Sequence, residues 1–458
     1  HAVYTHAVRY NGASPQNSQT FLAFNNCTNY GAQLVLSVGA LNCSSAAVGY
    51  GSGIAGLIYS EALARNLSPA LSAEEAKQLL SMTTDDIWVP ESDPTASNFD
   101  PAYYPSRPGW DQRFGYGRTN ARRALDWVRA GRIPPEVDIV SPRWFSVHDP
   151  DREGQQVLRI EGTIAARRAP RFDYTVEWAA GVEPDAMAWR TVRTERNVTA
   201  AVTDRLAEID LRDIRLDNPG EVENRFTLTV RIRAVAHYDA PIGDVPGEVR
   251  RAFYVRRDPT VLPGFPIDTG GSGEGSAHLA DLDGDGRREI VYPTADGEVH
   301  ALRGDGTPLP GWPVRTGRLL GFDPMRTPSY LGAPAYRAGP MGARPAIDPA
   351  QIHDPVIATP AIADLDGDGR PEVVVATYHG TVHVFRADGT PYGNGFPFNL
   401  PDVPSADTSP ERILDRGIFG SPVVYDLDGD MRPEIVFGAF DGKLYALDGR
   451  TGMVKPGF

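Results

Sequence analysis

The sequence predicts a multidomain, mostly β fold, in which a truncated α/β portion precedes a β-sandwich and part of a β-propeller. Three observations predict it. A Gly-rich helical pattern lies within residues 1–132, alternating apolar runs between turn signals fill 133–258, and a β unit occurs three times in 259–458. With 458 residues, of which 41% are apolar, the chain has enough material for several cores.

An acidic loop occurs three times in the last region, with Asp at positions 1, 3 and 5 and Glu at position 9. The copies are Asp281, Asp283, Asp285 and Glu289; Asp364, Asp366, Asp368 and Glu372; and Asp426, Asp428, Asp430 and Glu434. Oxygen ligands at positions 1, 3 and 5 are what a Ca²⁺ loop requires, although an EF-hand has its Glu at position 12. A β-branched or aromatic run follows each Glu here, so the loop leads into a strand.

A single loop of this kind could equally be an Asp/Gly-rich turn that binds nothing. Three copies with the same carboxylate spacing favour Ca²⁺ as the ligand. Position 6 is Gly286 in the first copy and Gly369 in the second, but Met431 in the third. Because a backbone conformation with positive φ would be strained at Met431, we expect the third site to be the weakest.

The repeated unit extends beyond the acidic loop. Each strand after a loop is followed by a hairpin signal, and a second alternating strand comes next. The hairpin signals are Asp296-Gly297, His379-Gly380 and Asp441-Gly442. An aromatic anchor then begins at Gly311, Gly395 and Gly457, and the same anchor precedes the first loop at Gly264. The first period, 47 residues, suits a four-stranded propeller blade, and the longer later periods predict insertions near 318–356 and 399–417.

These units resemble FG-GAP repeats, the blades of integrin-α-like β-propellers, whose acidic loops bind Ca²⁺. The resemblance covers about 259–458 and implies three blades. Propellers need about 4–8 blades to close. The chain begins without Met and stops at Gly457-Phe458, the opening of another unit. We therefore expect this sequence to be a fragment of a longer gene product.

A Gly-rich segment with a serine near its start lies in the first region. Residues 42–59 should run from a tight turn into a helix that ends near residue 65. Four Gly in its first turns each cost about 1 kcal/mol relative to Ala, so we expect the helix backbone to pack closely against its neighbours. Taken alone, Ser45 would be interpreted as a helix N-cap.

The segment resembles the catalytic-serine segment of subtilases, the subtilisin-like serine peptidases. Their pattern Gly-Thr-Ser-Met-Ala-x-Pro-His-Val-Ala-Gly aligns without gaps with residues 43–53, although Cys43 and Gly49 differ from it. Further matches are 34–38, 71–87 and 114–121, so the resemblance covers 1–132. It implies that Ser45 is the nucleophile of the intact protein. The family's Asp and His would lie upstream of this sequence, so we expect this chain alone to be inactive.

Cys27 and Cys43 are the only cysteines of the chain. A disulfide between them would fix the serine loop, and closing a loop of this size stabilises a fold by ~3 kcal/mol. The alternative is a pair of buried free thiols. We expect the disulfide, because Ca²⁺ loops point to an oxidising exterior.

Region 133–258 predicts an antiparallel β-sandwich of the immunoglobulin or fibronectin type. Pro134-Pro135 and Ser141-Pro142 indicate a linker, and strand-like runs with period-2 alternation follow. These runs are 157–162, 174–178, 199–203, 225–235 and 252–255. The region contains no recognisable site, so we interpret it as a spacer or docking module.

Two classes of function fit these features. The first is a secreted, calcium-binding serine endopeptidase, whose other domains hold protein or cell-surface substrates. The second is a non-catalytic, calcium-dependent adhesion protein with a degenerate peptidase domain. The retained Ser45 favours the first and the changes at Cys43 and Gly49 favour the second. We expect the extracellular enzyme. A net charge of −14 argues against nucleic-acid partners, and no apolar stretch approaches the ~20 residues of a membrane span.

Overall fold

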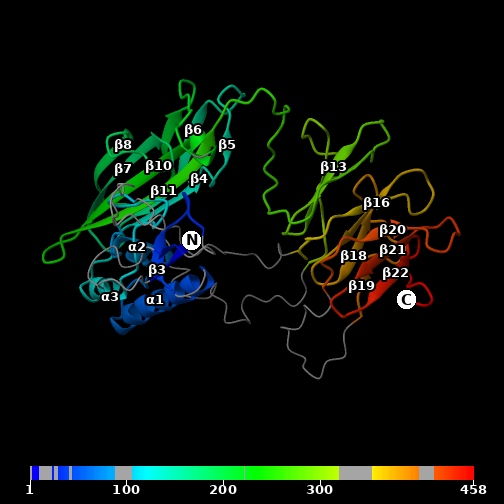
Figure 1. Cartoon of the computed structure of the whole chain (residues 1–458), viewed down its shortest axis with the longest axis horizontal. Coiled ribbons are helices and arrows are strands. Elements are labelled where there is room, and N and C mark those ends of the chain that lie inside the picture. The colour runs from blue at the N-terminus through cyan, green and yellow to red at the C-terminus, as the bar shows by residue number, and fades with distance from the viewer. Residues whose placement is uncertain are drawn as a thin grey trace, which may run out of the picture. The chain divides into compact units, whose positions relative to one another are not determined.

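The computed structural model describes residues 3–9, 23–24, 29–40, 44–87, 106–220, 222–318, 353–401 and 417–458. Strands dominate the described residues, which form two compact units that divide after Asp258 (Figure 1). No helix of the described part is long and apolar enough to cross a membrane.

The first unit begins with a small sheet and three helices. The elements are β1 (Thr5–Arg9), β2 (Ala23–Phe24), β3 (Leu36–Gly39), α1 (Ser44–Ala64), α2 (Ala73–Met82) and α3 (Ala121–Arg129). Strand β1 lies in the middle of the sheet, antiparallel to β2 and parallel to β3. The core between sheet and helices includes Leu36, Val38, Ile58 and Leu79, all nearly inaccessible to solvent.

Two glycines of the 114–121 segment are required by close backbone contacts. A Cβ added to Gly115 would lie 2.3 Å from the Val35 carbonyl oxygen, and one added to Gly117 would lie 2.3 Å from the Asp85 carbonyl oxygen. Both residues have positive φ, which favours glycine. The segment is thereby held between β3 and the end of α2, and Arg118 exchanges two backbone hydrogen bonds with Asp85.

Residues 136–255 form two sheets with a shared core. The strands are β4 (Glu136–Ser141), β5 (Val147–His148), β6 (Val157–Ala165), β7 (Arg171–Ala180), β8 (Arg190–Val198), β9 (Val202–Asp210), β10 (Thr227–His237) and β11 (Asp244–Val255), with a short helix, α4 (Val222–Arg225). One sheet has the order β5-β11-β10-β7-β8 and the other β4-β6-β9. Inward residues such as Ile160, Val176 and Ile232 are fully buried between them, as a sandwich requires.

Two expectations for this region are wrong. The strand expected at 199–203 lies mostly in the turn between β8 and β9. Strand β8 is an edge strand with mostly polar residues, so the apolar alternation that marks a strand is weak there. The linker expected at 134–142 contains β4, which pairs with β6 and buries Val137 and Ile139. The prolines therefore flank a core strand rather than a flexible connection.

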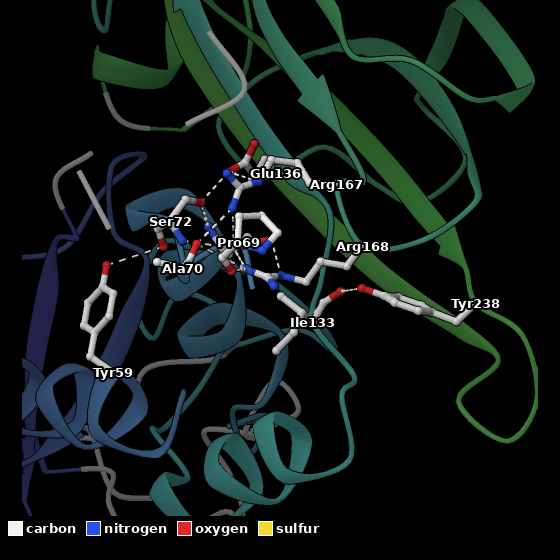
Figure 2. A network of polar contacts seen from close by, with 10 residues as sticks. Tyr59, Pro69, Ala70, Ser72, Ile133, Glu136, Arg167, Arg168 and Tyr238 are labelled. Atoms are coloured by element: carbon white, nitrogen blue, oxygen red, sulfur yellow. Dashed lines mark hydrogen bonds and ion pairs between the residues drawn. The ribbon is translucent and has the colours of Figure 1, made fainter. Parts of the chain in front are cut away.

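A buried polar network joins α2 to the sandwich (Figure 2). Glu75 closes the capping box of α2 with Ser72, whose hydroxyl also donates to Glu136 of β4. Arg168, in the turn between β6 and β7, forms two bonds of 2.8 and 2.9 Å with the Glu75 carboxylate. Arg167 lies 3.3 Å from the same carboxylate and 3.5 Å from that of Glu136. Burial raises the pKa of Glu136 to about 7, and the nearby Glu75 charge adds to this effect.

We expect Glu75→Gln to lower the free energy of unfolding of the first unit by about 3 kcal/mol, because it leaves the buried Arg168 without a charged partner. Gln at this position retains the capping box, so the loss isolates the charge. Urea unfolding followed by tryptophan fluorescence measures the effect. Arg205→Gln, which breaks an exposed pair with Glu208, should leave the midpoint unchanged. Equal midpoints for all three proteins would contradict the role of Glu75.

The second unit contains three antiparallel sheets built in chain order (Figure 1). Sheet one is β12 (His278–Ala280), β13 (Glu289–Pro293), β14 (Glu298–Leu302) and β15 (Val314–Arg315). Sheet two is β16 (Ala361–Ala363), β17 (Glu372–Ala376), β18 (Thr381–Phe385) and β19 (Phe398–Asn399). Sheet three is β20 (Val423–Tyr425), β21 (Glu434–Gly438) and β22 (Leu444–Asp448). The strands and hairpins expected after each acidic loop are confirmed.

The core of this unit lies between successive sheets. In β17, Val373 and Val375 pack toward sheet one, whereas Val374 and Ala376 pack toward sheet three. Because successive side chains of a strand point to opposite faces, both faces of β17 are buried. This explains why an apolar run without alternation follows Glu372.

Within the second unit, the aromatic anchors join each sheet to the following sheet. An added Cβ at Gly311 would lie 2.1 Å from the Asp388 carbonyl oxygen, in the hairpin of the following sheet. The adjacent Trp312 is buried and its Nε1 donates to the Ala387 carbonyl at 3.0 Å. Gly395 makes the equivalent approach to Thr451 of sheet three. The repeat of the aromatic anchor in the sequence thus corresponds to a repeated contact between neighbouring sheets.

Candidate functional site

Each acidic loop joins the first two strands of its sheet. The position 1 Asp follows the short first strand, and the position 9 Glu is the first residue of the second strand, β13, β17 or β21. The position 9 carboxylate is buried in all three copies, with 2% of Glu289, 2% of Glu372 and none of Glu434 exposed. The loops are thus tight turns, each with one buried charge at its base.

Backbone hydrogen bonds fix the shape of the loops. In the second loop, Asp364 Oδ1 accepts from the Gly367 amide at 2.7 Å, and Oδ2 accepts from the Gly369 amide at 2.9 Å. Glu372 Oε2 accepts from the Leu365 amide at 2.8 Å. The first and third loops contain the same three bonds. The position 1 and position 9 carboxylates therefore shape the turn while leaving oxygen lone pairs available to a ligand.

Carboxylate oxygens converge in every loop, to within 4.8 Å of one another. The groups are Asp281, Asp283 and Asp285; Asp364, Asp366 and Glu372; and Asp426, Asp428 and Glu434. Three expected ligands, Glu289, Asp368 and Asp430, lie outside these groups. Asp368 and Asp430 each accept from a backbone amide two residues on, so their side chains stabilise the turn.

Charge crowding is most evident in the second loop. Burial raises the pKa of Glu372 to about 7, and the negative charges of Asp366, Asp368 and Asp364 add to the effect. A hard divalent cation that prefers several oxygen ligands, such as Ca²⁺, fits this donor set. Asp364, Asp366 and Glu372 are the residues that would hold it, and its charge would offset their mutual repulsion.

The third loop differs at position 6. Met431 adopts φ of 67°, where Gly286 has 85° and Gly369 has 84°. The strained conformation expected for Met431 is therefore confirmed, since a side chain disfavours this region. The Met431 amide still donates to Asp426 at 2.9 Å, so the strain leaves the turn intact.

Sequence reasoning missed Lys455, which contacts the third loop. Its Nζ lies 2.8 Å from Asp428 Oδ2 and 2.7 Å from Glu434 Oε1. The hydrogen bond from Lys455 holds the pKa of Asp428 below its usual range. The corresponding positions in the repeats of the first and second loops are Leu309 and Tyr392. The change from an uncharged residue to a lysine at this position was therefore the signal in the sequence that could have revealed the contact.

Ser45 is the second residue of α1 and is exposed. Within the described residues, no His, Asp or Glu side chain forms a hydrogen bond with it. The close packing expected for the helix glycines is wrong for Gly49, Gly53 and Gly56, where an added Cβ would meet no atom of the described residues within 4 Å. Gly51 is the one of the four that approaches described neighbours, with Thr5 Cγ2 at 3.5 Å from the added Cβ. The reason is that α1 buries a single stripe and exposes the opposite face.

Three further expectations concern residues outside the described part. Both cysteines, Cys27 and Cys43, lie there, so the expected disulfide remains a prediction. Most of the expected insertions, near 318–356 and 399–417, also lie there.

Comparison with known families identifies one match, to the FG-GAP-like repeat, over residues 364–437. This range runs from the second acidic loop to the strand after the third. Residues 364–437 form an FG-GAP-like repeat. No curated protein matches the chain.

Several solved structures have low similarity to the chain. BamB from Moraxella catarrhalis has a TM-score of 0.24 and 14% identity over 54% of this chain and 62% of that one. BBS1N in complex with ARL6DN has a TM-score of 0.22 and 10% identity over 49% and 52%. The Pseudomonas aeruginosa PilY1 C-terminal domain has a TM-score of 0.18 and 12% identity over 50% and 67%. The chain covers less than two thirds of the first two.

We expect Met431→Gly to raise the free energy of unfolding of the second unit by about 0.5–1 kcal/mol, because it removes a left-handed side-chain conformation. Chemical unfolding in EDTA measures the change. Gly369→Ala is the reciprocal variant. It should lower stability by about 1 kcal/mol, because its Cβ meets no neighbour and only the backbone preference changes. A destabilised Met431→Gly protein would contradict the strain inferred at Met431.

Glu372 should make the metal-free second unit less stable as pH rises. Its folded pKa of about 7 lies above the ordinary value of 4.5, so the folded state binds the proton more tightly than the unfolded state. Its contribution to stability is complete below pH 4.5 and is lost as pH rises through 7. The melting temperature of wild type in EDTA should therefore fall relative to that of Glu372→Gln between pH 5 and 7.5. A constant difference between the two proteins would contradict the raised pKa.

Proposed function

We propose that this chain is part of an extracellular calcium-binding protein, whose FG-GAP-type units bind other proteins or surfaces. The observation that carries the proposal is the convergence of Asp364, Asp366 and buried Glu372 at the start of the FG-GAP-like repeat. Bound Ca²⁺ would supply positive charge and a cross-link between the loop and β17. Extracellular calcium modules commonly bind at ~10⁻⁴–10⁻³ M, and we place the second loop in that range.

Calcium should raise the melting temperature of the second unit and EDTA should lower it, while the first unit stays unchanged. The reason is linkage: a ligand that binds only the folded state stabilises it, by about 2.7 kcal/mol at a hundredfold excess over Kd. Scanning calorimetry of the full chain with Ca²⁺ and with EDTA measures both units.

Asp366→Asn should remove one calcium site in titration calorimetry. Glu274→Gln is the matched control, since Glu274 is an exposed acid of the same unit outside the acidic loops. Loss of binding in both variants would indicate an effect of net charge. A wild-type protein that takes up no Ca²⁺ at 5–10 mM, well above ~10⁻³ M, would sink the proposal.

A second candidate function is serine endopeptidase activity in a longer protein. The exposure of Ser45 in the first turn of α1, the helix that follows β3 in the chain, supports it. A fluorophosphonate probe should label the longer protein at Ser45, and Ser45→Ala should abolish labelling. Ser44→Ala is the control and should retain it. Absence of labelling in the longer wild-type protein would leave only the binding function.

A further inference from the structure

The three acidic loops differ in the cation that contacts them. In the first loop, Arg303 Nη2 lies 3.4 Å from Asp283 Oδ2, and both side chains are more than one third exposed. In the second loop, none of the ion pairs among the described residues involves the acidic side chains. In the third loop, Lys455 contacts two carboxylates at 2.7 and 2.8 Å. The third loop thus has a close, internal positive charge that the second lacks.

Lys455 occupies a structural position that is not basic in the other units. Its backbone amide donates to Ala446 at 2.9 Å, just as Leu309 donates to Ala301 and Tyr392 to Val384, both at 2.9 Å. Leu309 and Tyr392 are both buried, and only 19% of the Lys455 side chain is exposed. A backbone hydrogen bond to β22 therefore holds the lysine beside the loop.

The Lys455 ammonium contacts the loop positions that form the candidate metal ligands. Asp428 is at position 3 and Glu434 at position 9, the same positions as Asp366 and Glu372 in the second loop. Glu434 is fully buried, and among the described residues Lys455 is the cation that pairs with its carboxylate. A divalent cation at these oxygens would lie close to the ammonium and be repelled by it.

We propose that Lys455 closes the third acidic loop as an internal cation, so that this loop excludes Ca²⁺ at concentrations that fill the second loop. The inference rests on the proposed calcium function of the other loops. It assigns the third loop a different chemistry: one positive charge, supplied by the chain itself, replaces a metal ion. The sheet that contains the third loop is then stabilised regardless of the calcium concentration around the protein.

Calcium titration of the full chain tests this proposal. Lys455→Met removes the charge and keeps a long apolar side chain, so the variant should bind one more Ca²⁺ per chain than wild type. Lys455→Arg is the matched control and should bind as wild type does. Adding Asp428→Asn to Lys455→Met should remove the extra site. The same stoichiometry in wild type and Lys455→Met would overturn the proposal.

A second measurement does not depend on the folding of the Lys455 variants. In the wild-type background, Asp428→Asn should leave calcium stoichiometry unchanged, whereas Asp366→Asn should reduce it by one. Loss of a site in Asp428→Asn would show that the third loop binds Ca²⁺ despite the lysine.

The two proposals can be told apart by comparing wild type with Lys455→Met. If Lys455→Met binds Ca²⁺ and wild type does not, the internal cation is supported and the calcium function of the other loops is refuted. No uptake by either protein would refute both.

Discussion

The structure of the second unit depends on hydrogen bonds from backbone amides to two carboxylates in each loop. The Asp at position 1 accepts from two amides of the turn, and the Glu at position 9 ties the turn to the following strand. These bonds set the path of the chain. They also bring negative charges together at the base of the turn, where Glu372 is buried. The way the turn is built therefore crowds negative charge, which together with burial raises the pKa of Glu372.

Because the loop shape comes from backbone donors, the loops tolerate changes in side chains. Met431 donates the same hydrogen bond as Gly369, although its side chain makes the backbone conformation costly. In the third loop, the strain at position 6 and the arrangement of the carboxylates at positions 1, 3 and 9 are thus separate properties.

The repeated unit was predictable from sequence because its signals are local. Acidic loop, strand, hairpin and second strand all lie within about 25 residues, and three copies reinforce one another. The sandwich was harder, because the edge strand β8 has weak apolar alternation and β4 lies between two prolines. The exposed face of α1 was not predictable, since four glycines in a helix suggest close packing but do not specify it.

The contact of Lys455 with the third loop could not be predicted from the sequence of that loop alone. Lys455 lies 27 residues beyond Asp428 in the chain, and only the pairing of β21 with β22 and the following turn brings the two together. The acidic loop alone therefore cannot reveal its counter-ion. A metal ion and a lysine both relieve crowded carboxylates, but they differ in one respect. A metal ion is exchanged with the surroundings, so the stability it confers follows its concentration. A lysine is covalently part of the chain and confers the same stability everywhere. A protein that combines both can let one unit respond to calcium while its neighbour remains folded without it.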